Sequence, residues 1–167
     1  NLLSQHTIIE AQLAKSPVPV TFLRPGWFME NCSWDVAPAR EAGVVPSFLQ
    51  PLDKPVPMVA TADIGRLAAE LLQERSLAHQ VAELEGPRQV TPNEIAATLS
   101  DLLRRSVRME AVPRATWEGL FRSQGVKNPT PRIRMLDGFN EDWICFEGTP
   151  RKGSTELVTV LQSLIAA

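Results

Sequence analysis

The chain has 167 residues, 44% of them hydrophobic and 22% charged, which is the balance of a compact globular protein. Seventeen Lys and Arg residues against nineteen Asp and Glu residues give a net charge of −2, which argues against direct binding of nucleic acid. No apolar run approaches the ~18 residues that a membrane-spanning helix needs, and the first residues lack the order of a signal peptide. We therefore expect a cytoplasmic protein that contacts neither nucleic acid nor a membrane.

The first quarter of the chain predicts a helix followed by a buried strand. Apolar side chains recur at helical spacing over residues 1–15, at Leu2, Ile9 and Leu13. The apolar run at 18–23 is typical of a strand buried on both faces of a parallel sheet, and a loop and helix follow it up to Gly43. Because the chain begins at Asn1 inside a helical pattern without a clear cap, we expect that the N-terminal part of a larger protein is missing.

The rest of the chain alternates helical and extended patterns. Helices are predicted at 63–75, 92–105, 113–124 and 154–165. Strands are predicted at 79–84 and 107–112, with short extended pieces at 44–58 and 143–146 and an Arg-rich turn or helix at 130–136. Thr91 and Glu94 form a capping box that starts the second of these helices. This alternation argues for an α/β protein.

The two cysteines, Cys32 and Cys145, belong to no C-x-x-C pair, so neither a disulfide framework nor a metal centre is indicated. We expect both to be buried thiols.

The residues that follow the first strand are the first place to look for a ligand, because open α/β sheets bind ligands beyond the carboxyl ends of their strands. Gly26 permits close approach of the backbone, Trp27 and Phe28 offer flat faces, and Asn31 offers an amide. This mixture suits a planar ring that carries an amide. We expect a Gly26→Val change to impair binding more than folding. The alternative is a turn whose aromatic side chains simply enter the core.

The order of a helix with His6 and Glu10, then TFLRPGWFMEN, ATADIGRLAAELL and ELEGPRQVTPNEIAATL resembles the NmrA-like family of atypical short-chain dehydrogenase/reductase proteins. The resemblance spans nearly the whole chain. It implies the C-terminal portion of a Rossmann-like doubly wound fold plus a smaller α/β substrate-side subdomain. Residues 1–43 would be the last helix-strand units of the Rossmann-like domain and residues 44–167 the substrate-side subdomain.

The resemblance also implies NADP or NAD as cofactor. The family places an aromatic-x-Glu-Asn loop beside the nicotinamide, and a Lys or His one helix earlier, at the position of His6 here. The implied cofactor-binding residues are His6, Pro25, Gly26, Trp27, Phe28, Met29, Glu30 and Asn31. The implied substrate pocket is formed by Trp27, Phe28, Met135 and Phe139, and no metal is expected.

None of the nine glycines forms the glycine-rich turn that holds a dinucleotide pyrophosphate, so the N-terminal dinucleotide-binding half is absent from this chain. We expect the chain by itself to bind NAD(P)H weakly or not at all, and to associate through the apolar surface left open.

The function that the resemblance implies is NAD(P)H-dependent reduction of a quinone-like or carbonyl substrate. The chain contains no Tyr, so the usual Tyr-x-x-x-Lys acid/base pair is missing and His6 is the candidate catalytic proton donor. The missing Tyr favours an alternative, a non-catalytic NAD(P)H redox sensor with a regulatory protein partner. A third reading is a structural module without a ligand site. Each of these three functions is compatible with a homo-oligomer.

The segment GTPRKGST nearly spells a phosphate-binding P-loop, but Lys152 lies on the wrong side of Gly153 for that motif. We interpret it as a loop entering a helix that Ser154 or Thr155 caps.

Three further groups of residues have simple structural interpretations. Asp63 is interpreted as a helix N-cap, and Trp117 and Phe121, four residues apart, as core residues on one helix face. Arg132 and Arg134 could meet an anionic ligand or only solvent.

Overall fold

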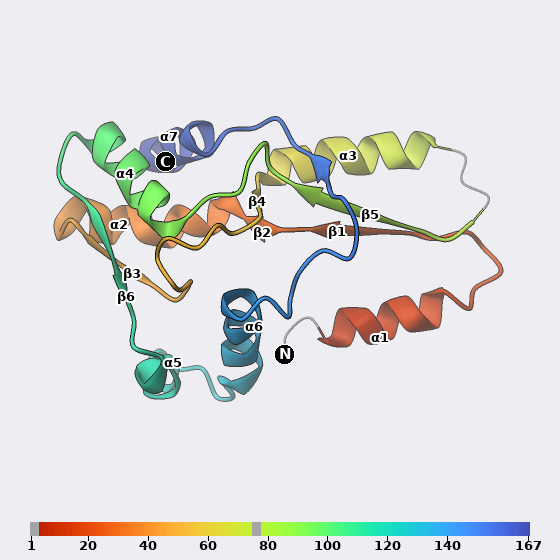
Figure 1. The fold of residues 1–167 in the computed structure, drawn as a ribbon, viewed down its shortest axis with the longest axis horizontal. Helices are drawn as coiled ribbons and strands as arrows, with labels where there is room; N and C mark the ends of the chain where they lie inside the picture. The colour runs from red at the N-terminus through yellow and green to blue at the C-terminus, as the bar shows by residue number, and fades with distance from the viewer. Residues whose placement is uncertain (1–3, 75–77) are drawn as a thin grey trace.

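The computed structural model describes residues 4–74 and 78–167, in which helices alternate with short strands from end to end (Figure 1). The strands form three small sheets, and every strand pair in them is parallel. This arrangement confirms the predicted α/β class.

The main sheet has the order β1-β5-β7, formed by β1 (Thr21–Pro25), β5 (Gln80–Glu85) and β7 (Arg151–Lys152). Helix α3 (Thr61–Gln73) covers one face, where its buried leucines pack against the buried side chains of β5. Helix α1 (Ser4–Leu13) lies on the opposite side of the sheet and runs antiparallel to β1 (Figure 1). The sheet is thus a layer between two helices.

The first strand differs from its prediction in two ways. It begins at Thr21 rather than at residue 18, because Pro17 and Pro19 have no backbone N–H to give to a neighbouring strand. All five of its residues are half-buried rather than buried on both faces. Among the described residues, β5 is the only strand paired with β1, so the other edge of β1 is open.

A second layered unit surrounds β3 (Val44–Ser47) and β6 (Arg108–Ala111), which pair in parallel. Three helices pack around the largest core cluster of the described chain: α2 (Ser33–Glu41), α4 (Pro92–Leu103) and α7 (Leu157–Ala166). A short pair, β2 (Trp27–Phe28) and β4 (Met58–Val59), connects this unit to the main sheet.

A third cluster is built by the 3-10 turn Arg114–Thr116 (η2), α5 (Trp117–Ser123) and α6 (Thr130–Asn140). Trp117 and Phe121 are fully buried there, which confirms that they are core residues. The guanidinium of Arg132 lies over the ring of Phe121 and that of Arg134 over the ring of Trp143. Both cations therefore stack on aromatic rings of the same chain.

The capping box that starts α4 is confirmed in full. The hydroxyl of Thr91 accepts a hydrogen bond from the Glu94 amide at 3.1 Å, and the Glu94 carboxylate accepts one from the Thr91 amide at 2.7 Å. The helices predicted at 63–75 and 113–124 also form, with α5 ending before Gly125 at a φ of +85°.

Other local predictions are wrong. Ala60 is the N-cap of α3, while Asp63 lies inside its first turn. Glu156 is the N-cap of α7, so neither Ser154 nor Thr155 caps that helix. Cys145 is exposed, since it lies in an irregular loop, whereas Cys32 is buried as predicted.

The segment 143–146 forms no strand, whereas β7 was not predicted. Leu2, which belongs to the predicted first helix, lies outside the described residues. The main sheet takes strands from both predicted parts, 1–43 and 44–167, and the division between them stays a prediction.

Candidate functional site

The carboxyl ends of β1 and β5 meet at one edge of the main sheet. Pro25 lies opposite Leu84, and the Gly26 amide donates a hydrogen bond to the Leu84 carbonyl at 2.8 Å. The chain then leaves this edge as two neighbouring loops, one beginning at Gly26 and the other at Gly86. This is the edge at which open α/β sheets bind ligands.

Gly26 is required by the protein's own backbone. The Trp27 amide donates to the Pro57 carbonyl oxygen at 2.8 Å, and a Cβ at Gly26 would overlap that same oxygen. The close approach predicted at this position therefore comes from the segment that leads into β4. This corrects the expectation that a larger side chain here would affect binding more than folding.

The loop after Gly26 exposes only some of its predicted cofactor residues. Phe28 and Asn31 are exposed, whereas Met29 is fully buried in the core and Trp27 is half-buried. The ring of Trp27 stands edge-on to Phe139, with ring centroids 5.2 Å apart. An aromatic ring and an amide are thus open to a ligand at this edge, and the cofactor role of these residues stays a prediction.

The Glu30 carboxylate fixes this loop on helix α3. Its Oε1 accepts hydrogen bonds from the Thr61 amide at 2.9 Å and from the Thr61 hydroxyl at 2.7 Å. The N-cap of α3, Ala60, has no side-chain acceptor, so Glu30 caps the helix from 31 positions earlier in the chain. Its Oε2 is buried and has no hydrogen-bond partner among the described residues.

His6 lies on α1, and its role at the site stays a prediction. It is exposed on the helix one turn before Glu10, whose carboxylate binds the Arg24 guanidinium through two nitrogens, the shorter contact being 2.6 Å. The pairing raises the pKa of Arg24 further, so the guanidinium keeps its charge. Helix α1 runs antiparallel to β1, so its first turn lies on the side of the carboxyl ends of the strands (Figure 1).

A half-buried carboxyl group, that of Asp35, follows the loop at the start of α2. Burial raises the pKa of Asp35 to about 6, against an opposing hydrogen bond from the Cys32 thiol. Burial, and then the Asp35 carboxyl group, raise the pKa of Cys32, so this thiol is not a nucleophile at neutral pH.

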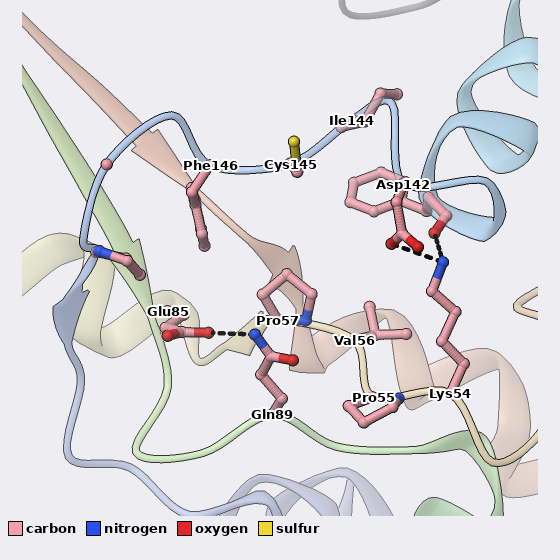
Figure 2. A pocket seen from close by; sticks show the side chains of 13 residues that line it. Lys54, Pro55, Val56, Pro57, Glu85, Gln89, Asp142, Ile144, Cys145 and Phe146 are labelled. Carbon is pink, nitrogen blue, oxygen red and sulfur yellow. Dashed lines mark hydrogen bonds and ion pairs between the residues drawn. The ribbon is translucent and has the colours of Figure 1, made fainter.

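A cavity of about 290 Å³ opens beside this edge (Figure 2). Three segments form it, at 54–57, at 85–89 and at 139–150. Its apolar walls include Val56, Pro57, Phe139, Ile144 and Phe146, and Lys54, Glu85, Gln89 and Asp142 bring polar groups to it. Of the predicted substrate-pocket residues, Phe139 lines the cavity and Trp27 packs against Phe139, while Phe28 and Met135 are not among its lining residues.

One wall of the cavity is held by a buried carboxylate that the sequence did not suggest. Glu83 on β5 accepts hydrogen bonds from the backbone amides of Glu147 at 2.9 Å and Gly148 at 2.8 Å. Since both partners are backbone groups more than sixty residues away, no local motif marks this role. Glu83 ties the segment 139–150 to the sheet.

The P-loop-like segment binds a carboxylate of its own chain. Asp63 accepts hydrogen bonds from the amide of Thr155 at 2.9 Å and from its hydroxyl at 3.1 Å, and it pairs with Arg66. Burial acts to raise the pKa of Asp63, but the hydrogen bonds from Thr155, Ser154 and Arg66 outweigh it and lower that pKa. Asp63 thus satisfies the donors that a phosphate would need.

Among residues 4–74 and 78–167, no helix has the length and apolar character needed to cross a bilayer. Within the same residues, no group of three or more His, Cys, Asp or Glu side chains is arranged to hold a metal ion.

The sequence profile of the NmrA-like family matches residues 2–140, most of the chain. This chain belongs to the NmrA-like family. An NAD(P)H azoreductase of Xenophilus azovorans is 31% identical over 104 residues, covering 62% of this chain and 35% of the relative. Quinone oxidoreductase 2 of Escherichia coli is 28% identical over 125 residues, covering 75% of this chain and 43% of the relative.

Solved structures of the same type share the fold. An NADPH-dependent quinone oxidoreductase of Escherichia coli in complex with NADPH superposes with a TM-score of 0.77 at 24% identity, covering 96% of this chain and 59% of that one. A triphenylmethane reductase of Citrobacter sp. has a TM-score of 0.74 at 18% identity, covering 97% and 58%. The fold is therefore Rossmann-like. The chain spans less than half of the two curated relatives and under two thirds of the solved ones.

Proposed function

We propose that this chain forms the substrate-side part of an NAD(P)H-dependent reductase of quinone-like or carbonyl substrates. The observation that carries the proposal is the carboxyl edge of the main sheet, where the loop beginning at Gly26 lies beside a cavity with both apolar and polar walls through the Trp27–Phe139 contact. The azoreductase and the quinone oxidoreductase named above are reductases that use NAD(P)H or NADPH, which supports the same chemistry here.

The residues at this edge fit the nicotinamide end of the cofactor and do not fit its pyrophosphate. Phe28 and Asn31 are exposed, so a flat ring and an amide are accessible to a planar ring that carries a carboxamide. The amides of Gly26 and Trp27 already donate to backbone carbonyls, and the described chain has no glycine-rich anion turn. Bound NAD(P)H would supply a hydride here.

A reductase also needs a proton for the substrate oxygen. The chain has no Tyr, so we assign proton donation to the His6 imidazole, a group type that exchanges protons near neutral pH. The Glu10–Arg24 ion pair holds the helix that carries His6 against β1. His6 would therefore protonate a substrate at the carboxyl edge.

The test uses the intact gene product, NADPH and a panel of quinones, with loss of the reduced-nicotinamide absorbance as the readout. We expect turnover in the wild type and a fall in kcat of about 100-fold or more in His6→Ala. Gln5→Ala, a change at the exposed neighbouring residue of α1, is the matched control and should leave kcat unchanged. Equal rates in His6→Ala and the control would remove His6 from the reaction.

A second function, a non-catalytic sensor of the NAD(P)H redox state, is favoured by the absence of Tyr. It would bind the dinucleotide without turnover, and its affinity for a regulatory protein partner would differ between NADP⁺ and NADPH. The same assay distinguishes the two functions, because a sensor leaves the quinone unreduced. Cytoplasmic location and self-association stay predictions from the sequence.

A further inference from the structure

We propose that the cavity beside Phe139 binds a neutral, flat, two-ring molecule that donates a hydrogen bond to the side-chain oxygen of Gln89. This assignment rests on the proposed reductase function and narrows its substrates to quinone-like or carbonyl compounds of two fused rings that also carry an O–H or N–H donor. It is argued from the charges, hydrogen bonds and dimensions of the cavity.

All three N–H donors of the lysine at the cavity are used by contacts within the protein, so none is free for an anionic ligand. The ammonium of Lys54 donates to the carbonyl oxygens of Phe139 at 2.9 Å and Asn140 at 2.7 Å, and it forms an ion pair with Asp142 at 2.7 Å. An ammonium has three donors, and these contacts use all three. Lys54 therefore closes one end of the cavity and does not attract an anionic group.

The carboxylate at the other end is compensated as well. Glu85 is buried, with Oε1 paired to the Lys152 ammonium at 2.5 Å and Oε2 accepting from the Gln89 amide nitrogen at 3.2 Å. A cationic ligand would have to displace Lys152 to reach it. Since burying an uncompensated charge is costly, the cavity favours neutral ligands.

Glu85 also determines which atom of the Gln89 amide group is available to a ligand. A carboxylate only accepts hydrogen bonds, so the nitrogen of the Gln89 amide must face Glu85 and the amide oxygen must face away from it. Figure 2 shows this oxygen directed along the cavity floor toward Val56. No hydrogen bond from the described residues reaches it. Because Gln89 is exposed, this oxygen is open to water and can also accept a hydrogen bond from a ligand with an O–H or N–H donor.

The dimensions and walls suit fused rings. The volume of about 290 Å³ is about twice that of the 150 Å³ engineered cavity that admits benzene. The rings of Pro57, Phe139 and Phe146 line it, and flat walls of this kind select flat ligands. The charged side chains in the walls are paired, the volume admits two rings, and one acceptor faces the cavity. Together these three features define the ligand class.

The test is isothermal titration calorimetry on the whole 167-residue chain, without NADPH. We expect β-naphthol to bind with a Kd about fivefold lower than that of its methyl ether, which has the same rings without the donor. Gln89→Met should remove the difference, while Gln73→Met on α3, outside the cavity, should preserve it.

Three results would overturn the assignment. Equal affinity for both compounds in the wild type would remove the donor requirement, and a preserved difference in Gln89→Met would remove Gln89. Absence of binding of either compound would remove the cavity as a binding site. Because calorimetry needs no hydride transfer, binding of β-naphthol to a protein that does not oxidise NADPH would support the cavity and reject the reductase separately.

Discussion

At the scale of single residues, Gly26 has the clearest physical requirement. A Gly26→Ala change adds a Cβ that overlaps the Pro57 carbonyl oxygen, a backbone atom that cannot move without breaking its hydrogen bond from Trp27. Overpacking of this kind costs about 1–3 kcal/mol, so we expect the free energy of unfolding to fall by that amount in urea denaturation.

Gly65→Ala is the matched control for this change. Gly65 lies inside α3, and a Cβ there meets no atom within 4 Å. Alanine is the better helix former, so the control should raise the free energy of unfolding by about 0.5–1 kcal/mol. If both variants behaved alike, the overlap with Pro57 would not explain the glycine.

The raised pKa of Asp35 predicts that the free energy of unfolding falls as pH rises. Burial raises its folded-state pKa from 3.8 to about 6, so the folded state holds the proton more tightly than the unfolded chain does. The cost of ionising Asp35 is absent below pH ~4, grows between about 4 and 6, and is complete above 6. Asp35→Asn should therefore raise the free energy of unfolding by on the order of 1–2 kcal/mol at pH 7.5 and change it little at pH 4.

Urea denaturation at both pH values measures this effect. Asp53→Asn, at an exposed residue, is the control and should behave as the wild type does at each pH. A uniform gain at both pH values would show that the asparagine acts through packing and not through the charge.

The site contacts that the sequence did not suggest share one property. Glu30, Glu83 and Lys54 bind backbone groups between 31 and 86 positions away in the chain. Spacing along the sequence carries no trace of such partners. The loop at 26–31 was identifiable because a strand, a glycine and aromatic residues are adjacent in the sequence. The carboxylates that fix the surroundings of this loop could not be identified in the same way.

At the scale of elements, local signals predicted what local interactions stabilise. The capping box of α4 and the apolar stripe of α3 are contained within one helix each, and both helices form where expected. Strand β7 was missed because it has two charged, exposed residues, and only its pairing with Leu84 and Glu85 makes it a strand. Sequence patterns thus located helices better than edge strands.

Asp63 joins two elements that are distant in sequence, α3 and the segment entering α7. In Asp63→Asn the new amide group faces the Thr155 amide, so at least one charge-assisted hydrogen bond is lost. We expect the free energy of unfolding to fall by about 2 kcal/mol at pH 7. The pKa of Asp63 is lowered, so its contribution is present above its unfolded pKa and lost as pH falls below it.

The control for this change is Asp101→Asn, at an exposed position of α4. Urea denaturation should separate the two variants at pH 7 and bring Asp63→Asn closer to the wild type in acid. A loss of equal size in Asp101→Asn would mean that net charge, and not the α3–α7 connection, determines the effect.

At the scale of the whole molecule, the prediction of an α/β layering was correct because parallel strands and covering helices follow from alternating apolar patterns. The burial of β1 was overestimated. Its apolar run indicates a strand with neighbours on both sides, yet the described residues supply a partner on one edge only. An apolar run shows that a strand is suited to having neighbours on both sides. In the described residues, β1 has a neighbouring strand on one side only.

The open edge of β1 and the outer face of α1 predict self-association. No described residue of α1 is buried, and the side chains of Ile8 and Ile9 are 59% and 49% exposed. Exposed apolar side chains beside an unpaired strand edge favour pairing with a second copy. We expect sedimentation velocity to show association that increases with protein concentration.

Ile8→Lys should weaken this association about tenfold, because burying one isoleucine contributes about 1.5–3 kcal/mol and a lysine at the same place would have to be desolvated. Leu72→Lys is the matched control. Leu72 is 88% exposed on α3, across the sheet from α1, so a charge there should leave the association unchanged (Figure 1). If Leu72→Lys dissociated the protein as strongly as Ile8→Lys does, general charge repulsion would explain the result, and the exposed face of α1 would not be the contact.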